Sequence, residues 1–374
     1  MRSNCDFLGK HIRLVDSRNK DEVTNTVLGI SINKEFMPSV ANVIGTDLSR
    51  YKLIQKGMFA CNPMHVGRDK RLPIALYKED IPAIVSPAYF MFEIIDPTIL
   101  DMDYLMMWFR RPEFDRECWF MTDGSVRGGI TWDDLCRIRI PIPPIEKQRS
   151  IVKAYQTIID RIALKRKINE NLEATAQAYF DNLFFPAVEP NCTLADIAEV
   201  NPVRPLKKGM VARCFDMSTL PTKGCIPAGD EIKPYNGGVR FTNGDTLIAR
   251  ITPCLENGKA AYINLLKDGE IAFGSTEYIV FAAKDAMPSS FYYFLIRNSR
   301  FFTFALQFMN GSSGRQRVSG EELASFPLVK PSSEKLNAFD KVGSMVLEQM
   351  KENTVEIHKL TQLQEIITAI LSSQ

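Results

Sequence analysis

The feature that most limits what this chain can fold into is an internal repeat. Met121 and Met309 lie 188 positions apart, and at that offset further identities follow in the same order without a gap. These pairs are Tyr104 with Tyr292, Phe120 with Phe308, Ser125 with Ser313, Arg127 with Arg315, Leu135 with Leu323, Pro143 with Pro331, Glu146 with Glu334, Lys147 with Lys335, Leu172 with Leu360 and Leu183 with Leu371. Twice this offset nearly equals the length of 374 residues. Ordered identities at one offset predict two copies of one structural unit.

The first part of each copy has the pattern of a mixed α+β domain, at 1–143 and 187–331. Short apolar runs such as AIVSPAYFMFEII and EYIVFAA predict strands, separated by Gly, Pro and Asn-Gly turns. A helix is expected at 100–114, with its counterpart at 289–309, packed on the sheet. Upstream of these helices the two copies agree poorly, and the register slips by one residue where Tyr89 meets Tyr278.

The second part of each copy predicts a long helix, at 144–186 and 332–374. Each follows a Pro and a Glu-Lys pair, as in PIPPIEKQRSIV and PSSEKLNAFD, and no Pro or Gly interrupts the first between Glu146 and about Phe185. About 40 residues of helix span roughly 60 Å. Apolar residues at 3–4 spacing predict the pairing face: Val152, Tyr155, Ile159, Ile162, Leu172 and Leu183, with Phe339, Val346, Ile357, Leu360, Ile367 and Leu371.

Two arrangements of these helices are open. They either pair with each other or pack separately on their own domains, and the shared pattern over five heptads favours pairing. Polar interruptions at Arg166, Asn169 and Asn353 are candidates for setting the register of the pair.

Composition favours an ordinary globular protein but does not define its function. Hydrophobic residues make up 45% and charged residues 24%, and no apolar run reaches the roughly 18 residues that a membrane span needs. The N-terminal residues lack a signal-peptide pattern, and eight cysteines occur without a C-x-x-C motif, so we expect a reducing, cytoplasmic location and no membrane partner. A net charge of +2 neither requires nor excludes nucleic acid.

Motifs for catalysis are weak. The sequence has no G-x-x-x-x-G-K-[ST] loop, no N-P-P-[YF] loop for a flipped base and no convincing S-adenosylmethionine loop. Asp216 followed by Glu231-x-Lys233 has the spacing of a Mg²⁺ nuclease, but PAGDEIKPYNGG is rich in turn residues, which favours an exposed charged loop. Cys61 and His65 lack a third orienting group, and the three histidines are too scattered to predict zinc. We therefore expect no catalytic residue and no metal.

Two loops at matching places in the repeat suit DNA binding. TDGSVRGG at 122–129 contains Ser125 and Arg127, and NGSSGRQR at 310–317 contains Ser313, Arg315 and Arg317. An arginine present in both copies cannot distinguish two different DNA sequences, so we interpret the Arg127 and Arg315 pair as a phosphate contact or a structural brace.

Loops that differ between the copies are better candidates for base recognition. They supply Asn62, Arg68, Lys70 and Arg71 in the first copy, and Arg204, Lys207, Lys208 and Arg250 in the second, with Asn257 and Lys259 nearby. The alternative is that these are solvated loops. The basic run RIALKRK at 161–167 is a solvated helix face, a phosphate contact or a contact to a partner protein.

Several of these segments resemble one family. The region 138–184, with its P-P-I-x-x-Q start and KINENLEATAQAYF, looks like the central conserved region of type I restriction–modification specificity (S) subunits. Segments 45–68 and 110–134 resemble their target recognition domains, and LADIAEVNP and NGSSGRQRVSGEELASFPLVKPSSEK in the second half fit the same family. One departure is the lack of a second glutamine matching Gln148, which predicts looser pairing there.

The resemblance implies a fold and a function. Two target recognition domains are separated by two long helices that form an antiparallel coiled coil, with an internal pseudo-twofold repeat. Each domain recognises one half of a bipartite site on double-stranded DNA, and the helices set the spacing. Two methyltransferase subunits dock on the helices, and restriction/translocase subunits can join.

This non-catalytic specificity subunit is expected to bind no cofactor. S-adenosylmethionine would bind the DNA adenine methyltransferase partner, and ATP and Mg would bind the endonuclease partner. Two alternatives stay open: a stand-alone Mg-dependent nuclease with duplicated domains, and a helical scaffold that binds only protein.

Overall fold

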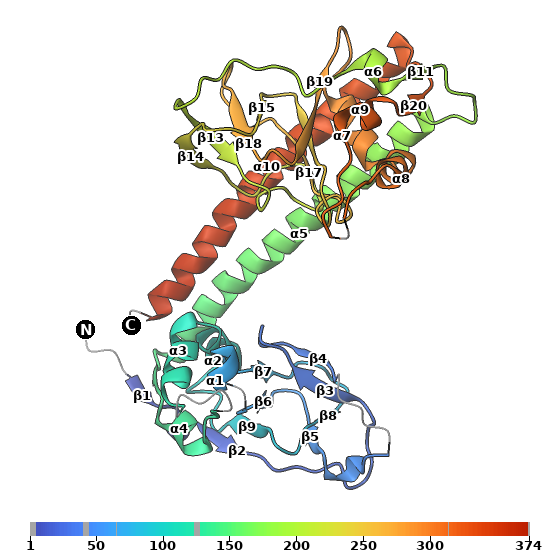
Figure 1. The fold of residues 1–374 in the computed structure, drawn as a ribbon. Coiled ribbons are helices and arrows are strands. Elements are labelled where there is room, and N and C mark those ends of the chain that lie inside the picture. The colour runs from blue at the N-terminus through green and yellow to red at the C-terminus, as the bar shows by residue number, and fades with distance from the viewer. Residues whose placement is uncertain (1–4, 40–44, 65, 123–127, 313, 373–374) are drawn as a thin grey trace. The chain divides into compact units, whose positions relative to one another are not determined.

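The computed structural model describes residues 5–39, 45–64, 66–122, 128–312 and 314–372 (Figure 1). Contacts divide the chain into two compact units: unit 1 comprises Met1–Asp160 with Leu360–Gln374, and unit 2 comprises Arg161–Lys359. The helices α5 (Ile145–Phe184) and α10 (Ser333–Ser372) each contribute residues to both units. The long helices are therefore part of the units themselves.

Unit 1 contains three small sheets. One four-stranded sheet has the order β2-β9-β6-β7, a second has β4-β3-β8-β5, and β1 pairs with β10. Their bounds are β1 Cys5–Phe7, β2 Ile12–Leu14, β3 Val27–Ile30, β4 Phe36–Pro38, β5 Lys52–Ile54, β6 Phe59–Cys61, β7 Ile74–Leu76, β8 Ala83–Val85, β9 Phe90–Ile94 and β10 Arg139–Pro141. Only β3 and β8 pair in parallel among these described strands.

Unit 2 repeats this topology strand for strand. Its sheets have the orders β12-β19-β16-β17 and β14-β13-β18-β15, with β11 paired to β20 and a parallel pairing of β13 with β18. The bounds are β11 Cys192–Thr193, β12 Ala198–Val200, β13 Val211–Phe215, β14 Glu231–Pro234, β15 Val239–Phe241, β16 Thr246–Ala249, β17 Ala260–Tyr262, β18 Ala272–Gly274, β19 Tyr278–Ala283 and β20 Pro327–Leu328. The predicted duplication is confirmed, even upstream where few residues match.

Four of the shorter helices in unit 1 have a counterpart among the described helices of unit 2. Unit 1 has η1 Leu8–Lys10, η2 Leu48–Arg50, α1 Val66–Asp69, α2 Met102–Phe109, α3 Pro112–Phe120 and α4 Trp132–Arg137; unit 2 has α6 Leu194–Ile197, α7 Ser290–Arg297, α8 Ser299–Gln307 and α9 Gly320–Ala324. The single helix expected in each copy is a pair of helices. Pro112 begins α3, and Asn298 caps α8 by accepting hydrogen bonds from the amides of Arg300 and Phe301.

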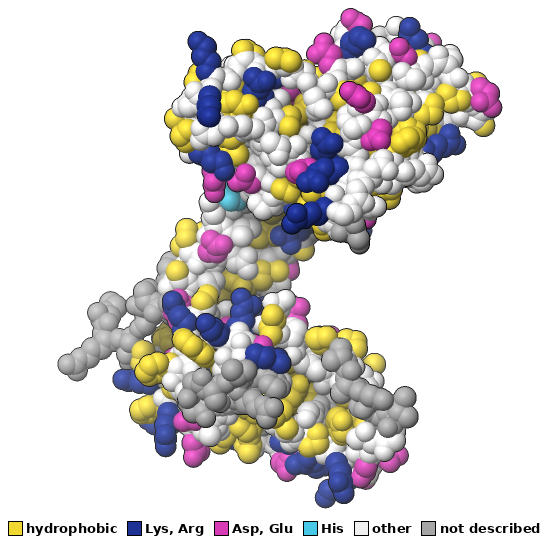
Figure 2. Space-filling view, viewed as in Figure 1, with side chains coloured by type: hydrophobic (Ala, Val, Ile, Leu, Met, Phe, Trp, Pro, Cys, Tyr) yellow, Lys and Arg dark blue, Asp and Glu magenta, His cyan; other side chains and the backbone are white. Residues whose placement is uncertain are grey.

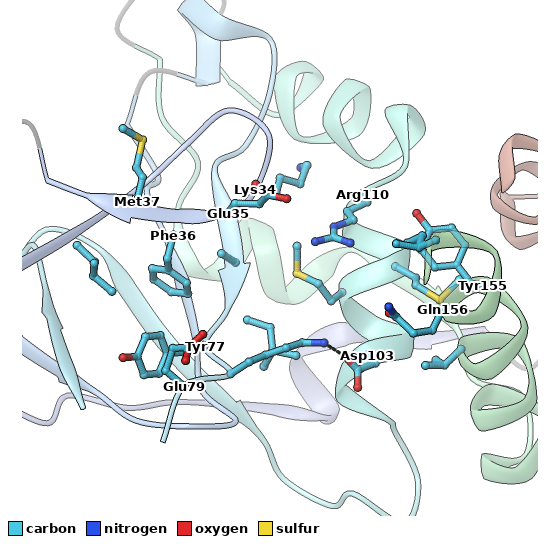
Figure 3. Close-up of a pocket in the computed structure, with 18 of the residues that line it drawn as sticks. Lys34, Glu35, Phe36, Met37, Tyr77, Glu79, Asp103, Arg110, Tyr155 and Gln156 are labelled. Carbon is cyan, nitrogen blue, oxygen red and sulfur yellow. Dashed lines mark hydrogen bonds and ion pairs between the residues drawn. The ribbon is translucent and has the colours of Figure 1, made fainter. Parts of the chain in front are cut away.

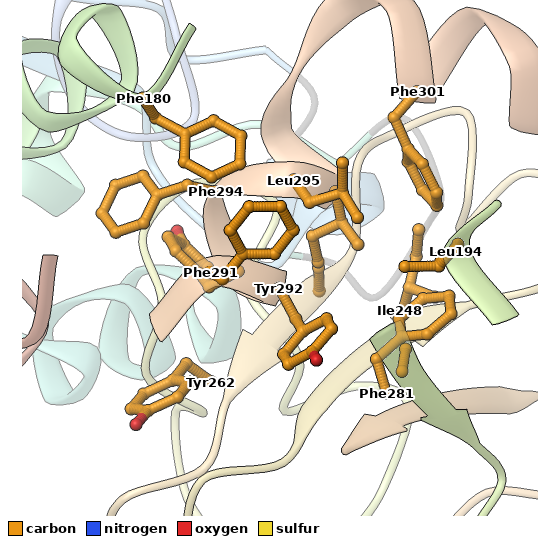
Figure 4. Close-up of a cluster of buried hydrophobic side chains, with 14 of the residues drawn as sticks. Phe180, Leu194, Ile248, Tyr262, Phe281, Phe291, Tyr292, Phe294, Leu295 and Phe301 are labelled. Atoms are coloured by element: carbon orange, nitrogen blue, oxygen red, sulfur yellow. The ribbon is translucent and has the colours of Figure 1, made fainter. Parts of the chain in front are cut away.

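The core of unit 2 joins its sheet to the long helices (Figure 4). Helix α7 is buried all round, and Phe180 of α5 packs against Phe291 of α7 with ring centroids 5.0 Å apart. Phe339 of α10 lies 5.0 Å from the same Phe180 ring. Burial of aromatic rings contributed by three helices therefore fixes the helix segments to this domain.

The two arrangements considered for the long helices, pairing with each other and packing on their own domains, occur together. In unit 2 the helices run antiparallel, because Arg161 bonds to Glu356 whereas the later Phe180 packs on the earlier Phe339. In unit 1 the Tyr155 hydroxyl accepts a hydrogen bond from Gln364 Nε2 at 3.0 Å. The helices thus pair with each other and also pack on their own domains.

The apolar residues predicted for pairing are placed as follows. Tyr155, Ile162, Phe339 and Val346 are buried; Val152, Ile159, Leu172, Leu183 and Ile367 pack at the edges of the cores; Ile357 and Leu360 are half-buried; and the Leu371 side chain lies outside the described part. Met350, which the same spacing also offers, is buried, and the periodicity did not single out Ile158, Phe184, Leu336 and Leu347, which are buried as well.

A polar layer interrupts the helix pair in unit 2. Asn353 is 1% exposed, donates from Nδ2 to Asn169 Oδ1 at 2.7 Å, and accepts from Lys165 Nζ at 2.9 Å. Asn169 and Asn353 therefore meet as the register hypothesis requires, whereas Arg166 is exposed and the layer uses Lys165 instead. Lys165 and Asn353 occupy equivalent places in the repeat, so their contact marks the midpoint of the pairing register.

Gln148 has a different role from the one expected. Its buried side chain donates to the carbonyls of Ile99 at 2.8 Å and Pro143 at 2.7 Å, and it accepts from the Asp101 amide at 2.9 Å. These bonds join the start of α5 to the loop before α2. Leu336, the equivalent residue, is buried in the unit 2 core instead, and the looser pairing expected there stays a prediction.

Candidate nucleic-acid interface

In unit 1 the two predicted DNA-binding loops meet beyond the end of β6. The Gly67 amide donates to the Gly128 carbonyl at 3.0 Å, and the Ile130 amide donates to the Pro63 carbonyl at 3.1 Å. A Cβ at Gly129 would lie 2.9 Å from the Pro63 oxygen, so this approach leaves no room for a side chain. The segments 62–64, 66–71 and 128–130 therefore form one surface.

In unit 2 the corresponding loops also meet, beyond the end of β16. The Thr252 amide donates to the Gln316 carbonyl at 3.0 Å, and the Gln316 amide donates to Thr252 Oγ1 at 3.0 Å. The Val318 amide donates to the Arg250 carbonyl at 3.0 Å. Because strands β6 and β16 are equivalent, both units place a divergent loop beside a shared loop at the same point of the fold. This paired-loop surface is the candidate site.

The arginines of the unit 2 surface differ in their availability. The Arg317 guanidinium bonds to Glu277 at 2.8–3.1 Å, and this hydrogen bonding holds the pKa of the Glu277 carboxyl below its usual range. Arg250 is half-buried, and its Nε has no hydrogen-bond partner in the described part of the chain. Arg315 is exposed, with no side-chain ion pair to the described residues. Among the described residues of this surface, Arg250 and Arg315 are thus the arginines without an acidic partner.

The remaining predicted residues of unit 2 lie on other parts of its surface. Lys207 and Lys208 are exposed on the connection between β12 and β13. Lys259 donates to the Met217 carbonyl at 2.7 Å and so supports a loop. Arg204 Nη2 binds both carboxylate oxygens of Asp245, at 2.6 and 2.9 Å, and Asp245 is 2% exposed. An intramolecular partner therefore occupies the Arg204 guanidinium.

The Arg204 pair makes stability depend on pH. Burial raises the pKa of Asp245 from 3.8 to about 6, partly offset by the Thr242 amide and Arg204. When the pKa of an acid is higher in the folded than in the unfolded state, the acid adds to the free energy of unfolding at low pH. This contribution is complete below the unfolded-state pKa and is lost as the pH rises through the folded-state pKa. Arg204→Gln removes the cation and raises this folded pKa further. We expect the free energy of unfolding of the variant to fall about 2 kcal/mol below that of the wild-type protein at pH 8, and by less at pH 5. Denaturant titrations of both proteins at the two pH values measure this difference. A deficit that is equal at both pH values would contradict an ionised Asp245.

In unit 1 some of the residues predicted to bind DNA are bonded to other residues of the fold, and others are exposed. Asn62 Oδ1 accepts from the Met64 amide at 3.1 Å, and Arg68 forms two hydrogen bonds with Asp69, at 2.7 and 2.9 Å. Lys70 lies 5.0 Å above the Trp119 ring, and Arg71 is exposed. Figure 2 shows Lys and Arg side chains gathered over α2 and α3 of this unit. Ser125, Arg127, Ser313 and His65 lie outside the described residues.

Two arginines that sequence reasoning missed border the same region. Arg110 and Arg116 line one cleft with Lys70 and Arg71. Arg110 also lines a larger neighbouring cleft between the β3–β4 hairpin, α2 and α5 (Figure 3). The basic stretch RRPEFDR, at a break between two helices, could have marked these arginines as candidates. Nothing in the sequence predicts that this stretch lies beside residues 70–71.

The basic run on α5 takes part in helix pairing. Arg161 and Lys165 bind the Glu356 carboxylate, and Lys165 Nζ lies 2.9 Å from its Oε2. These bonds lower the pKa of Glu356. Lys167 makes only an exposed contact to Glu170 at 3.7 Å, and Arg166 is exposed. Half of this run is therefore used between the helices, and half faces outward.

The weak catalytic patterns have structural explanations. Lys233 Nζ lies 3.0 Å from Asp216 Oδ2 and 3.4 Å from Glu231 Oε2, so the D…E-x-K residues do come together. The expectation that they sit in an irregular loop was wrong, because Glu231–Pro234 forms the edge strand β14. The lysine is bonded to both carboxylates, and hydrogen bonding to Asp216 raises its pKa.

The described residues offer no reactive thiol at Cys61 and no metal site. Cys61 is fully buried, and burial raises its thiol pKa to about 12, so it lacks the thiolate that a nucleophile needs. Within the described ranges, no group of three His, Cys, Asp or Glu side chains could hold a metal. None of the helices in the described ranges combines the length and the hydropathy of a membrane span.

Comparison with known proteins finds similarity to type I restriction–modification specificity subunits. Residues 75–174 match the family described as the type I restriction modification DNA specificity domain. The specificity subunit of type I restriction enzyme EcoAI from Escherichia coli is 34% identical over 132 residues, which cover 34% of this chain and 22% of that protein. The specificity subunit of EcoEI from the same organism is 29% identical over 192 residues, or 48% of this chain and 32% of that protein.

A solved structure extends the likeness to the whole fold. The type I restriction–modification S subunit from M. genitalium matches with a TM-score of 0.62 at 12% identity, over 99% of this chain and 96% of that one. This chain therefore has the S-subunit fold, with two duplicated domains and long antiparallel helices. The family match over residues 75–174 agrees with the resemblance found in the sequence. The aligned stretches span 22% and 32% of the two E. coli relatives.

Proposed function

We propose that this chain is the DNA sequence-recognition subunit of a type I restriction–modification complex. The observation that supports this most directly is the paired-loop surface, which occurs at the same strand end in both units and combines a shared loop with a divergent one. Two equivalent surfaces with different side chains suit a bipartite site, in which each unit recognises one half. Arg250 and Arg315 in unit 2, and Lys70 and Arg71 in unit 1, supply available cations for double-stranded DNA.

The partners and cofactors follow from this assignment. Two methyltransferase subunits dock on the long helices, where Leu164, Ile168 and Val355 are apolar and exposed by 59%, 36% and 39% in unit 2. Restriction/translocase subunits join this assembly. S-adenosylmethionine binds the methyltransferase, ATP and Mg bind the restriction partner, and this chain supplies specificity without catalysis. The complex works in the cytoplasm.

A domain exchange tests the proposal. Residues 187–331 are replaced by the matching domain of a relative that keeps aromatic residues at positions 291 and 294, so that the core contacts of Phe180 are retained. Genomic mapping of methylated adenines, with the methyltransferase partner present, is expected to show one changed half-site and one unchanged half-site. Because the helices at 144–186 and 332–374 are untouched, the spacer between the half-sites is expected to keep its length.

The alternatives give different results in this experiment. Two changed half-sites, or none, would refute the modular assignment. Metal-dependent cleavage by the purified chain would indicate a nuclease. A scaffold that binds only protein would form the complex without any sequence-selective DNA binding.

A further inference from the structure

A basic cleft on unit 1 brings Lys70 and Arg71 together with Arg110. Its volume is about 420 Å³, and it lies where the β3–β4 turn, the end of α1 and the corner between α2 and α3 come together. The lining residues are Ile32, Asn33, Lys34, Lys70, Arg71, Arg110, Pro112, Asp115 and Arg116. Five of these side chains are basic, and only one is acidic.

The single acid of the cleft is already used within the fold. Asp115 Oδ1 accepts from Lys34 Nζ at 2.6 Å and from the Leu72 amide at 3.0 Å, with the two side chains only 11% and 5% exposed. This ion pair forms a neutral floor. Arg116 contacts Glu113 at 2.9 Å, but both groups are largely exposed, so water and salt weaken that pair.

Three cations of the cleft remain uncompensated. Lys70, Arg71 and Arg110 make no ion pair within the described part of the chain. The Arg110 guanidinium points from α2 toward the hairpin that carries Lys34 and Glu35 (Figure 3). Three like charges around one concavity repel one another, and an anion bound between them relieves that repulsion.

Aromatic side chains extend this surface toward solvent. Trp119 is 40% exposed and Phe120 is 87% exposed at the end of α3, and Lys70 Nζ lies 5.0 Å above the Trp119 ring. Basic and aromatic side chains side by side are typical of nucleic-acid surfaces, where cations bind phosphates and rings contact sugars or bases. Charge and chemistry therefore favour a DNA backbone over a protein partner.

We propose that this cleft binds a backbone phosphate of DNA, with Arg71 and Arg110 donating to the phosphate oxygens and Lys70 adding a third positive charge. Arginine suits this role because its planar guanidinium donates two parallel hydrogen bonds to one oxyanion. The assignment rests on the proposed DNA-recognition function and adds a defined anchor to it.

The anchor belongs to unit 1 alone. At the repeat offset, Asn298 stands in place of Arg110, Thr303 in place of Asp115 and Phe304 in place of Arg116. Asn298 is buried and caps α8, so the described residues of unit 2 lack this group of cations at the corner. The contact therefore fixes the position of one half-site and carries no base information.

Arg110→Gln and Arg71→Gln test the anchor in the full chain with its methyltransferase partner. Arg137→Gln is the control, because it removes the same charge from a side chain that is 74% exposed and outside the cleft. The dissociation constant for duplex DNA is measured across a series of salt concentrations. Each cleft variant is expected to bind roughly tenfold more weakly, with the slope of log K against log salt shallower by about 0.9, the value for one lost phosphate contact.

Further readouts separate the possible outcomes. The double variant is expected to change the slope no more than either single variant, because both arginines bind one phosphate, and melting temperatures should stay unchanged because neither loses an ion pair. Cleft variants that behave like Arg137→Gln, while the wild-type complex binds DNA, would overturn the anchor alone. Failure of the wild-type complex to bind DNA would overturn the function itself. Thermal stabilisation by inorganic phosphate that Arg110→Gln abolishes, with DNA binding intact, would assign the cleft to a free phosphate and refute the DNA contact.

Discussion

Phe180→Ala is expected to lower the free energy of unfolding of unit 2 by about 3–5 kcal/mol, the range for removing a fully buried aromatic ring. The Phe180 side chain is 0% exposed. Its ring centroid lies 4.9 Å from Phe184 and 5.0 Å from both Phe291 and Phe339. The substitution leaves a cavity where α5, α7 and α10 meet, so it weakens both the domain core and the attachment of the helices.

Hydrogen exchange is the suitable measurement, because a chain of two units need not unfold in one step. Amides of α7 are expected to lose protection first. Phe120→Ala is the matched control, since the same atoms are removed from a side chain that is 87% exposed, and we expect its effect to stay within about 0.5 kcal/mol. A loss below about 1 kcal/mol for Phe180→Ala would mean that this aromatic cluster does not stabilise unit 2.

Asp115→Asn is expected to destabilise unit 1 by about 3–5 kcal/mol, because it leaves the buried ammonium of Lys34 without its anion. The substitution keeps the shape of the side chain and an oxygen that can accept from the Leu72 amide, so the main loss is electrostatic. Burial already lowers the pKa of Lys34, and the charge of Asp115 opposes that shift. Removal of the carboxylate therefore lowers the folded pKa of Lys34 further.

The sign of the pH effect follows from this shift. A base whose folded pKa is depressed binds fewer protons when folded, so stability rises with pH between the folded pKa and the ordinary lysine value of about 10.4. The deficit of Asp115→Asn should accordingly shrink as the pH is raised from 7 toward 10. Denaturant titrations detected by tryptophan fluorescence measure this loss of stability in unit 1, because Trp108, Trp119 and Trp132 all lie in this unit.

A double variant separates the charge effect from packing. Lys34→Met/Asp115→Asn removes both charges, and replacement of a buried ion pair by neutral groups is often close to neutral in stability. We expect the double variant to regain at least half of the loss caused by Asp115→Asn alone. Equal instability of the two variants would show that the ion pair matters through shape and not through charge.

Much of this architecture could be predicted from the sequence because its signals are local or repeated. The absence of Pro and Gly between Glu146 and Phe184, with apolar residues every three or four positions, predicts a long helix from backbone hydrogen bonding alone. The 188-residue offset predicts the duplication without any knowledge of the strands. The matched loops beside matched strands then indicate where the proposed bipartite DNA site would be recognised.

Which basic side chains remain without an acidic partner was decided only by the tertiary structure. Arg204, predicted for DNA, is bonded to Asp245, whereas Arg110, not predicted, is left without an acidic partner beside Lys70 and Arg71. Loop composition identifies basic residues but does not show which acid folds against each of them. Glu231–Pro234 likewise looks like a loop by composition and becomes a strand because β13 offers it a hydrogen-bonding edge. The sequence by itself determined the duplicated domains and long helices through local periodicity, and long-range contacts decided the pairing of charges and the shape of the binding surface.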